Sequence, residues 1–367
     1  MKLIRRAGFA VGLAAVSGIA SATPCDSALS NYESAVLIRD TVTAGLLLSS
    51  HPECFGASAI TSRTQINATS FAQAAAISRA VGLRFASDAP GPRADAGIRG
   101  MAAGGAGKKW NGWGNVANND TRQSYRALNT FTSTQDSDIL NAVVGADYTL
   151  SPTMVLGVSA AYDKGDGSGF NSGPGNTPNN IDTHGYSIAP YLGMQLSKEL
   201  VFDASFGIGR GRITSSTLTE AESDRWFAAA NLGYERWRGN IQFTGKASLL
   251  HGVEKYDDAK DTQLGFLFNG TAARNTIDQL RLNVQAGYWI DGFMPYAGLG
   301  YTNDLRRKTT QFGAPSNPIG RDAWVWTVGV DFFSLASGMT GGVAYRQEES
   351  RDNQKNHSLT GNLSIRF

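Results

Sequence analysis

Histidine and acidic side chains that lie close together in the chain are the first candidates for chemistry. His184 follows Asp182 by two residues, and His251 precedes Glu254 by three. A histidine beside a carboxylate can act as a general base. Such pairs also arise by chance in polar loops, and no nucleophile elbow or phosphate-binding loop accompanies them. We therefore expect no enzyme activity, and a hydrolase is the least favoured alternative.

A second acidic group, Asp257, Asp258 and Asp261, lies in one polar segment and could bind a divalent cation. Its spacing differs from that of a calcium-binding loop, so a solvated acidic patch is the favoured interpretation. We predict no cofactor and no metal site.

The chain has two cysteines, Cys25 and Cys54. In an exported protein they would meet an oxidising compartment, where a disulfide is plausible. Such a bond would close a loop of about 30 residues and stabilise it by roughly 3 kcal/mol.

The N-terminal residues indicate export. Lys2, Arg5 and Arg6 precede the uncharged apolar segment Ala7–Ala20, and a small-x-small site ends at Ala22. This order predicts a Sec signal peptide over residues 1–22. Without it the chain would be about neutral, which gives no support for nucleic-acid binding. Because no later segment is apolar enough for a spanning helix, a membrane location would require a β-barrel.

Apolar residues alternate with polar ones from Trp110 onward. In the last segment, Phe367, Ile365 and Leu363 share one face, and Arg366 and Ser364 share the other. A period of two predicts strands with one apolar face. Twelve such segments can be placed, at about 110–118, 137–149, 153–163, 183–197, 199–211, 224–237, 239–252, 276–290, 292–304, 322–335, 339–347 and 357–367.

The connections alternate between short turns and longer polar segments. Short turns are expected near Ser151-Pro152, Ser197-Lys198, Arg238-Gly239, Asp291-Gly292 and Ala336-Ser337-Gly338, and long loops include 164–181 and 254–275. Outer-membrane barrels show this asymmetry, with short turns toward the periplasm. We therefore predict an all-β fold, a 12-stranded antiparallel transmembrane barrel over residues 110–367.

In such a barrel the apolar faces look toward lipid, and the polar faces look into the lumen. The inward set would include charges of both signs: Asp147, Asp203, Glu235, Lys246, Arg281, Asp331, Arg346 and Arg366. These charges could line a pore, or they could pair with one another and hold a plug. We favour pairing, because buried charges need partners.

The chain before the barrel has a different composition. Residues 70–85 are rich in alanine, follow Thr69 and Ser70 as potential caps, and predict a helix of about four turns. A second helix is possible near residues 28–48, and residues 86–109 are a Gly/Ala-rich linker. We therefore divide the N-terminal part into a short segment, 23–65, and a helix with its linker, 66–109.

The order of these features resembles a known family. A helix and the segment Gly100-Met101-Ala102-Ala103-Gly104-Gly105 precede Trp110-Asn111-Gly112-Trp113-Gly114 and twelve strands that end in Phe. Segments 144–148, 156–162 and 185–193 also resemble strands of this family. The combination is similar to the β-domain of autotransporters, over about residues 66–367.

The resemblance implies a barrel in the outer membrane of a Gram-negative bacterium, with the helix in the lumen. It further implies that Leu363, Ile365 and Phe367 form the signal read by the barrel-assembly machinery, with periplasmic chaperones and outer-membrane lipid as the other partners of a monomeric barrel. Only residues 23–65 precede the helix, so we expect the barrel to anchor or display a short segment. The main alternative is a diffusion pore, with the helix outside the lumen.

Overall fold

The computed structural model describes residues 31, 34, 35, 40, 43, 58–85, 109–127, 131–171, 179–215, 219–262, 267, 272–309, 319–334 and 339–367. The predicted signal peptide, Cys25, Cys54 and the linker lie outside these residues, so the disulfide stays a prediction. In the predicted helix near 28–48, Asn31, Ser34, Ala35 and Thr43 are helical and Asp40 is not, and the rest is likewise outside the described residues. No helix among the described residues is long and apolar enough to cross a membrane.

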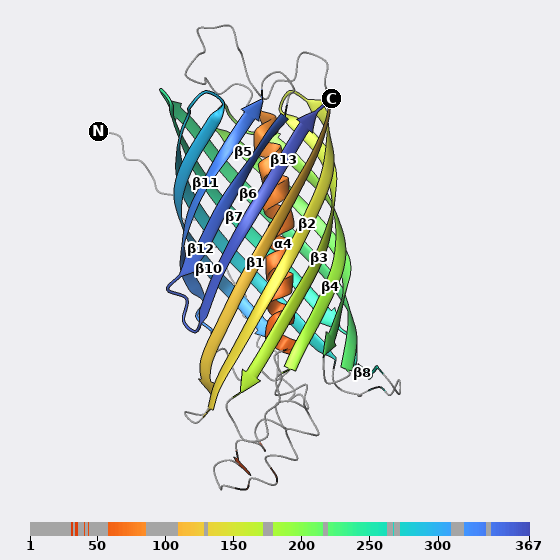
Figure 1. Cartoon of the computed structure of the whole chain (residues 1–367). Helices are drawn as coiled ribbons and strands as arrows, with labels where there is room; N and C mark the ends of the chain where they lie inside the picture. Colours follow the sequence, from red (N-terminus) through yellow and green to blue (C-terminus); the bar gives the residue numbers. More distant parts are fainter. Residues whose placement is uncertain are drawn as a thin grey trace, which may run out of the picture.

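The prediction of a 12-stranded antiparallel barrel is confirmed (Figure 1). Its wall consists of β1 (Trp110–Ala127), β2 (Phe131–Ser151), β3 (Met154–Asn171), β4 (Asn179–Gln195), β5 (Leu200–Ser215), β6 (Thr219–Arg238), β7 (Ile241–Tyr256), β9 (Ala273–Tyr288), β10 (Phe293–Thr309), β11 (Asp322–Ser334), β12 (Met339–Glu349) and β13 (Gln354–Arg366). Each strand pairs with its neighbour in sequence, and β1 pairs with β13 to close the barrel. A two-residue strand, β8 (Lys260–Asp261), lies beside β6 outside the wall.

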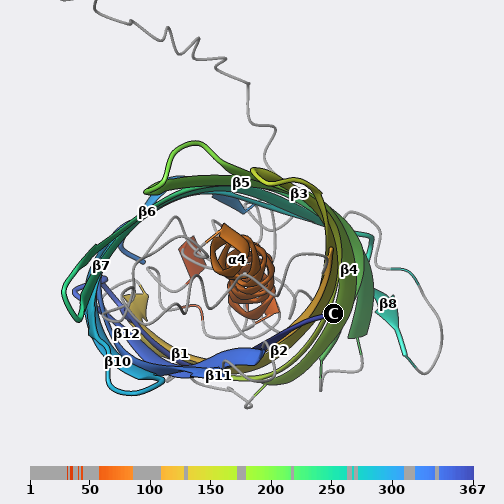
Figure 2. The ribbon, with the colours of Figure 1, turned by 90° about the horizontal axis from the view of Figure 1, so that it is seen from above.

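Helix α4 (Ser58–Phe85) runs through the barrel lumen (Figures 1 and 2). The predicted start at Ser70 was wrong, because the helix begins at Ser58, inside the segment that we assigned to 23–65. Thr69 and Ser70 are buried within the helix and do not cap it. The weak helix formers before them are helical because the barrel surrounds them, since packing outweighs a small difference in propensity.

The strands are also longer than predicted at the rim far from the chain's C-terminus. The expected loop 164–181 is mostly strand, because β3 ends at Asn171 and β4 begins at Asn179. Only three residues separate β1 from β2, and three separate β5 from β6. Polar residues extend the strands there because each backbone N–H and C=O group gains a hydrogen-bond partner on the neighbouring strand. The asymmetry therefore lies more in strand length than in loop length.

The opposite rim carries tight turns. Asp291 and Gly292 have φ angles of 43° and 96° between β9 and β10. Two successive residues with positive φ are typical of a type I′ hairpin, as predicted from the Asp-Gly pair. The expected turn at 336–338 lies outside the described residues. Following the loop asymmetry of outer-membrane barrels, we call this rim periplasmic and the other external.

The outer face of the barrel is apolar around its whole circumference. Large side chains exposed there include Val144, Leu156, Tyr186, Phe206, Val284, Leu299, Trp324 and Val328. The strands have 11 to 21 residues, and about 9 to 11 suffice to cross a bilayer at a tilt. Strands β1 to β4 and β6, which have 17 to 21 residues, therefore project beyond this band on the external side.

Four aspartates form a row on this projecting outer face. Asp120, Asp138, Asp166 and Asp182 lie directly opposite one another across β1, β2, β3 and β4. Like charges at such positions repel each other. The hydrogen bond with Asp166, together with burial, raises the pKa of Asp182 above its ordinary value. The row is thus an unfavourable feature of the external rim at neutral pH.

Candidate functional site: the barrel lumen

Helix α4 is seated against one side of the lumen. It packs mainly against β2, β3, β4 and β5, as Figure 2 shows from above. Phe71, Ile77 and Val81 form one buried cluster with residues of this wall. The contact is close at Gly193, where an added Cβ would lie 2.4 Å from Val81. A larger residue there would push the helix away from the wall.

A buried amide fixes the helix to this wall. Gln73 is fully buried and donates a hydrogen bond from Nε2 to Ser159 Oγ at 2.9 Å. Its Oε1 accepts a hydrogen bond of 2.7 Å from Ser187 Oγ. Ser159 lies on β3 and Ser187 on β4, so one side chain ties the helix to two strands.

Two arginines connect the helix with the opposite wall. Arg79 on α4 forms an ion pair with Asp331 on β11 and donates a hydrogen bond of 2.9 Å to Asn362 on β13. Arg366 on β13 donates a hydrogen bond of 3.0 Å to the backbone oxygen of Leu83. The helix is therefore held on both sides of the lumen, and its C-terminal turn is tied to the last strand.

A hydrogen-bond network crosses the seam where the barrel closes. Trp113 donates to the Tyr191 hydroxyl at 2.8 Å, and this hydroxyl donates to Asp147 at 3.0 Å. Asn111 also donates to Asp147 at 3.0 Å and accepts from Ser364 at 2.9 Å. These residues come from β1, β2, β4 and β13, so the network joins the first strand to the last.

A buried ion cluster joins residues of three strands near the external rim. Arg225 on β6 reaches Asp163 on β3 at 2.6 Å and Glu254 on β7 at 3.1 Å. Its guanidinium passes over Gly185 and Gly211, where an added Cβ would lie 2.4 and 2.0 Å from it. The absence of side chains at these glycines is what lets the arginine reach β3.

A second cluster lies across the lumen, at the external ends of β9 to β12. Asp304 binds Arg307 and Gln279, and accepts a hydrogen bond of 3.0 Å from Arg351. Both arginines also donate to the backbone oxygen of Gly320, at 3.0 and 3.1 Å. The two clusters cross-link the external end of the barrel on opposite sides.

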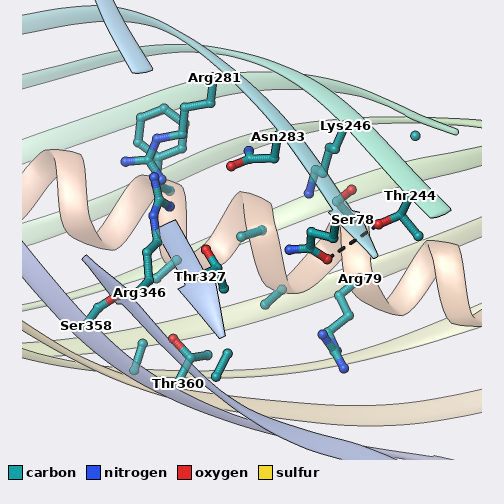
Figure 3. Close-up of a pocket in the computed structure, with 18 of the residues that line it drawn as sticks. Ser78, Arg79, Thr244, Lys246, Arg281, Asn283, Thr327, Arg346, Ser358 and Thr360 are labelled. Carbon is teal, nitrogen blue, oxygen red and sulfur yellow. Dashed lines mark hydrogen bonds between the residues drawn. The ribbon is translucent and has the colours of Figure 1, made fainter. Parts of the chain in front are cut away.

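Because the helix lies against one wall, a cavity of about 750 Å³ remains beside it. Its lining includes five of the predicted lumen charges: Asp203, Glu235, Lys246, Arg281 and Arg346. Figure 3 shows Arg281 beside Arg346 and, further along the helix, Lys246, with hydroxyl and amide side chains around them. The other three predicted charges lie elsewhere, with Asp331 on Arg79, Arg366 on the helix end and Asp147 in the seam network.

The candidate histidine pairs do not form a catalytic arrangement. His184 and Asp182 are both exposed on the outer face of β4, and Asp182 interacts with Asp166. The pairing of His251 with Glu254 was wrong, because the two lie on opposite faces of β7. His251 contacts Asp278 on the outside, whereas Glu254 is buried against Arg225.

The acidic loop shows no metal-binding geometry in its described part. Asp258 accepts a hydrogen bond of 2.7 Å from the Ala272 backbone. Across the described ranges, no three His, Cys, Asp or Glu side chains converge as metal ligands would.

Sequence reasoning missed Gln73, Arg79 and the two external clusters. Asp163, Arg225 and Asp304 lie on the same alternating faces as the predicted inward charges, so the period of two could have found them. Nothing comparable marks Gln73 or Arg79, because their partners are hundreds or tens of residues away in the sequence. Leu363, Ile365 and Phe367, the residues of the predicted assembly signal, are all exposed on the outer face of the last strand or its end.

Comparison with known proteins agrees with this architecture. Residues 110–346 match the model of the family described as the autotransporter beta-domain. No curated protein matches the sequence significantly.

Three solved translocator structures share the fold. The translocator domain of NalP from Neisseria meningitidis is similar with a TM-score of 0.51 and 15% identity, over 71% of this chain and 89% of that one. The beta domain of Bordetella BrkA has a TM-score of 0.51 and 14% identity, over 71% and 100%. The transport unit of AIDA-I from Escherichia coli has a TM-score of 0.51 and 12% identity, over 80% and 98%.

Proposed function

The chain belongs to the autotransporter β-domain family, and on this premise we propose that its barrel anchors and displays a short N-terminal segment. Barrels of this family lie in the outer membrane of Gram-negative bacteria. The displayed segment is the chain that precedes Ser58, and the site of display is the cell surface.

The direction of the helix is the observation that carries this proposal. Its C-terminal turn is bonded to Arg366, next to the chain end on the periplasmic rim. Its other end places Ile66 beside Gly252 and near the Ile277 side chain, toward the external rim. A chain that enters the lumen from the periplasmic rim and leaves along α4 would therefore emerge outside.

The contacts of the helix support a permanent anchor. Gln73, Arg79 and Arg366 tie α4 or its end to β3, β4, β11 and β13. A buried helix with polar ties on two sides resists displacement, because each broken tie leaves a polar group without a partner. The segment upstream of Ser58 would thus remain attached to the barrel.

Protease treatment of intact cells tests the proposal. We expect trypsin to cut after Arg39 in intact cells, so that the peptide ending at Arg39 is released once the predicted Cys25–Cys54 disulfide is reduced, while Lys198 and Arg238 in the periplasmic turns stay uncut. Permeabilising the outer membrane should then expose the two turns. The proposal is wrong if cleavage at Arg39 also requires permeabilisation.

A narrow diffusion pore is the second candidate, and the cavity beside the helix favours it. The cavity is lined by Lys198 and Trp237 near the periplasmic rim and by Arg351 and Gln354 near the external rim. From the sequence we placed the helix of such a pore outside the lumen, and that placement was wrong. Planar-bilayer recording separates the two functions: a steady open current, even a small one, would favour the pore, whereas no current would favour the anchor.

A further inference from the structure

The cavity beside α4 is a positively charged chamber. Eight Lys or Arg side chains line it, against five Asp or Glu side chains. Its middle section is lined by Arg281 from β9 beside Arg346 from β12, and by Lys246 from β7 further along the helix, beyond Asn283 (Figure 3). Lys246 interacts electrostatically with Asp203 and with Arg79, Arg281 and Arg346. Four cations thus line one continuous cavity.

The nearby carboxylates are already engaged. Asp331 is paired with Arg79, and Asp304 binds Arg307 and Arg351. Asp203 accepts a hydrogen bond of 2.7 Å from Asn231 and attracts Lys246. The five acids of the chamber therefore offset its eight cations only in part.

The three wall cations are poorly paired in the part of the chain that the structure describes. Lys246 and Arg281 form no ion pair within 4 Å, and Arg281 lies over the Phe71 ring at 3.4 Å. Arg346 approaches Glu348 only to 3.9 Å, and its Nη2 atom has no hydrogen-bond partner. Cations held together without counter-charges repel one another, and an anion between them relieves this repulsion.

We propose that this chamber binds a small oxyanion, with Lys246, Arg281 and Arg346 as its charged ligands. Guanidinium groups match the paired oxygens of phosphate or carboxylate, and charge-assisted hydrogen bonds are the strong ones. Hydroxyl and amide side chains nearby, from Asn283, Thr327, Ser358 and Thr360, supply neutral donors. The site takes a free oxyanion from solution, and it does not depend on whether the N-terminal segment is displayed.

Titration of the full-length protein in detergent with inorganic phosphate at low ionic strength tests the proposal. We expect saturable binding that weakens as salt is added, because salt screens the attraction. Removing one charge with Lys246→Gln or Arg346→Gln should weaken binding roughly tenfold, since each variant removes a charge-assisted contact. The variant with both substitutions should show no measurable binding.

Two further variants separate charge from shape and from folding. Arg346→Lys keeps the charge and should retain most of the binding. Arg306→Gln removes one positive charge from an exposed position on β10 and should bind phosphate like the native protein. Heat-modifiable migration on gels reports whether each barrel has folded. Unchanged binding in the folded double variant would overturn the proposal, as would equal weakening by Arg306→Gln or the absence of binding by the native protein.

Discussion

Replacing Gln73 with alanine should loosen α4 from the barrel wall. The change removes two buried hydrogen bonds, each with a net value of about 1 kcal/mol. It leaves the Ser187 hydroxyl without its acceptor, whereas the Ser159 hydroxyl keeps the Ala189 backbone oxygen. It also removes the packing of one buried methylene, Cγ, worth about 0.8 kcal/mol. Together these effects predict a loss of about 3 kcal/mol in the free energy of helix docking.

Hydrogen exchange measures this loss directly. A docking free energy lower by about 3 kcal/mol should speed exchange of the α4 amides by roughly 100-fold, because exchange follows the population of the undocked state. Amides in β9 to β13 should keep their rates. Ala75→Ser is the matched control, because Ala75 is exposed and lines the cavity.

A double-mutant cycle shows whether the effect passes through the hydrogen bond. If Gln73 acts through Ser187, then Ser187→Ala should have little effect in a Gln73→Ala background. Helix amides that exchange at native rates in Gln73→Ala would refute the reasoning. Acceleration spread equally over helix and strands would also refute it, because it would indicate loss of the whole barrel.

Three other substitutions test the barrel itself. Asp163→Asn should lower the temperature at which the barrel loses heat-modifiable migration, because it breaks a buried pair with Arg225 that is worth roughly 3 kcal/mol or more; an unchanged temperature would contradict this. Asp166→Asn should raise that temperature at neutral pH by removing repulsion from Asp182. Because the pKa of Asp182 is raised, protonation stabilises the folded state, so the gain should shrink as the pH falls into the acid range; a gain independent of pH would show that charge is not the cause. We also propose that Phe367 is read during assembly, so that Phe367→Ala lowers the amount of folded barrel in the outer membrane; equal amounts for both chains, compared by gel migration, would reject this role.

Alternation along the chain was enough to predict the barrel, because lipid outside and water inside impose a period of two on each strand. This period places Leu282 and Val284 on the outer face of their strand and Arg281 on its inner face. Strand ends were not predictable in the same way, since residues such as Asp166 and Gly167 have no strand preference and are ordered by the partner strand. The prediction of where α4 starts failed for a similar reason, because Ile66 and Thr69 are helical through their contacts with the barrel wall.

The partners of the lumen residues were the least accessible part of the site. Period two places Arg225 on an inward face, but it does not reveal that Gly185 and Gly211 leave a path to Asp163. His251 and Glu254 are close in sequence, yet an odd separation along a strand puts them on opposite faces. Predicting which lumen side chains pair therefore requires the register of the strands, and that register depends on the whole sheet.

The off-centre position of α4 has a consequence for how the two halves of the barrel accept changes in sequence. On the β2 to β5 side, inward residues touch the helix closely, and at Gly193 even one added methyl group would collide with Val81. On the β9 to β12 side, inward residues such as Asn283 and Thr327 face the cavity, where a larger side chain has room. Substitutions on the β9 to β12 side can therefore change the shape and charge of the cavity without disturbing the helix.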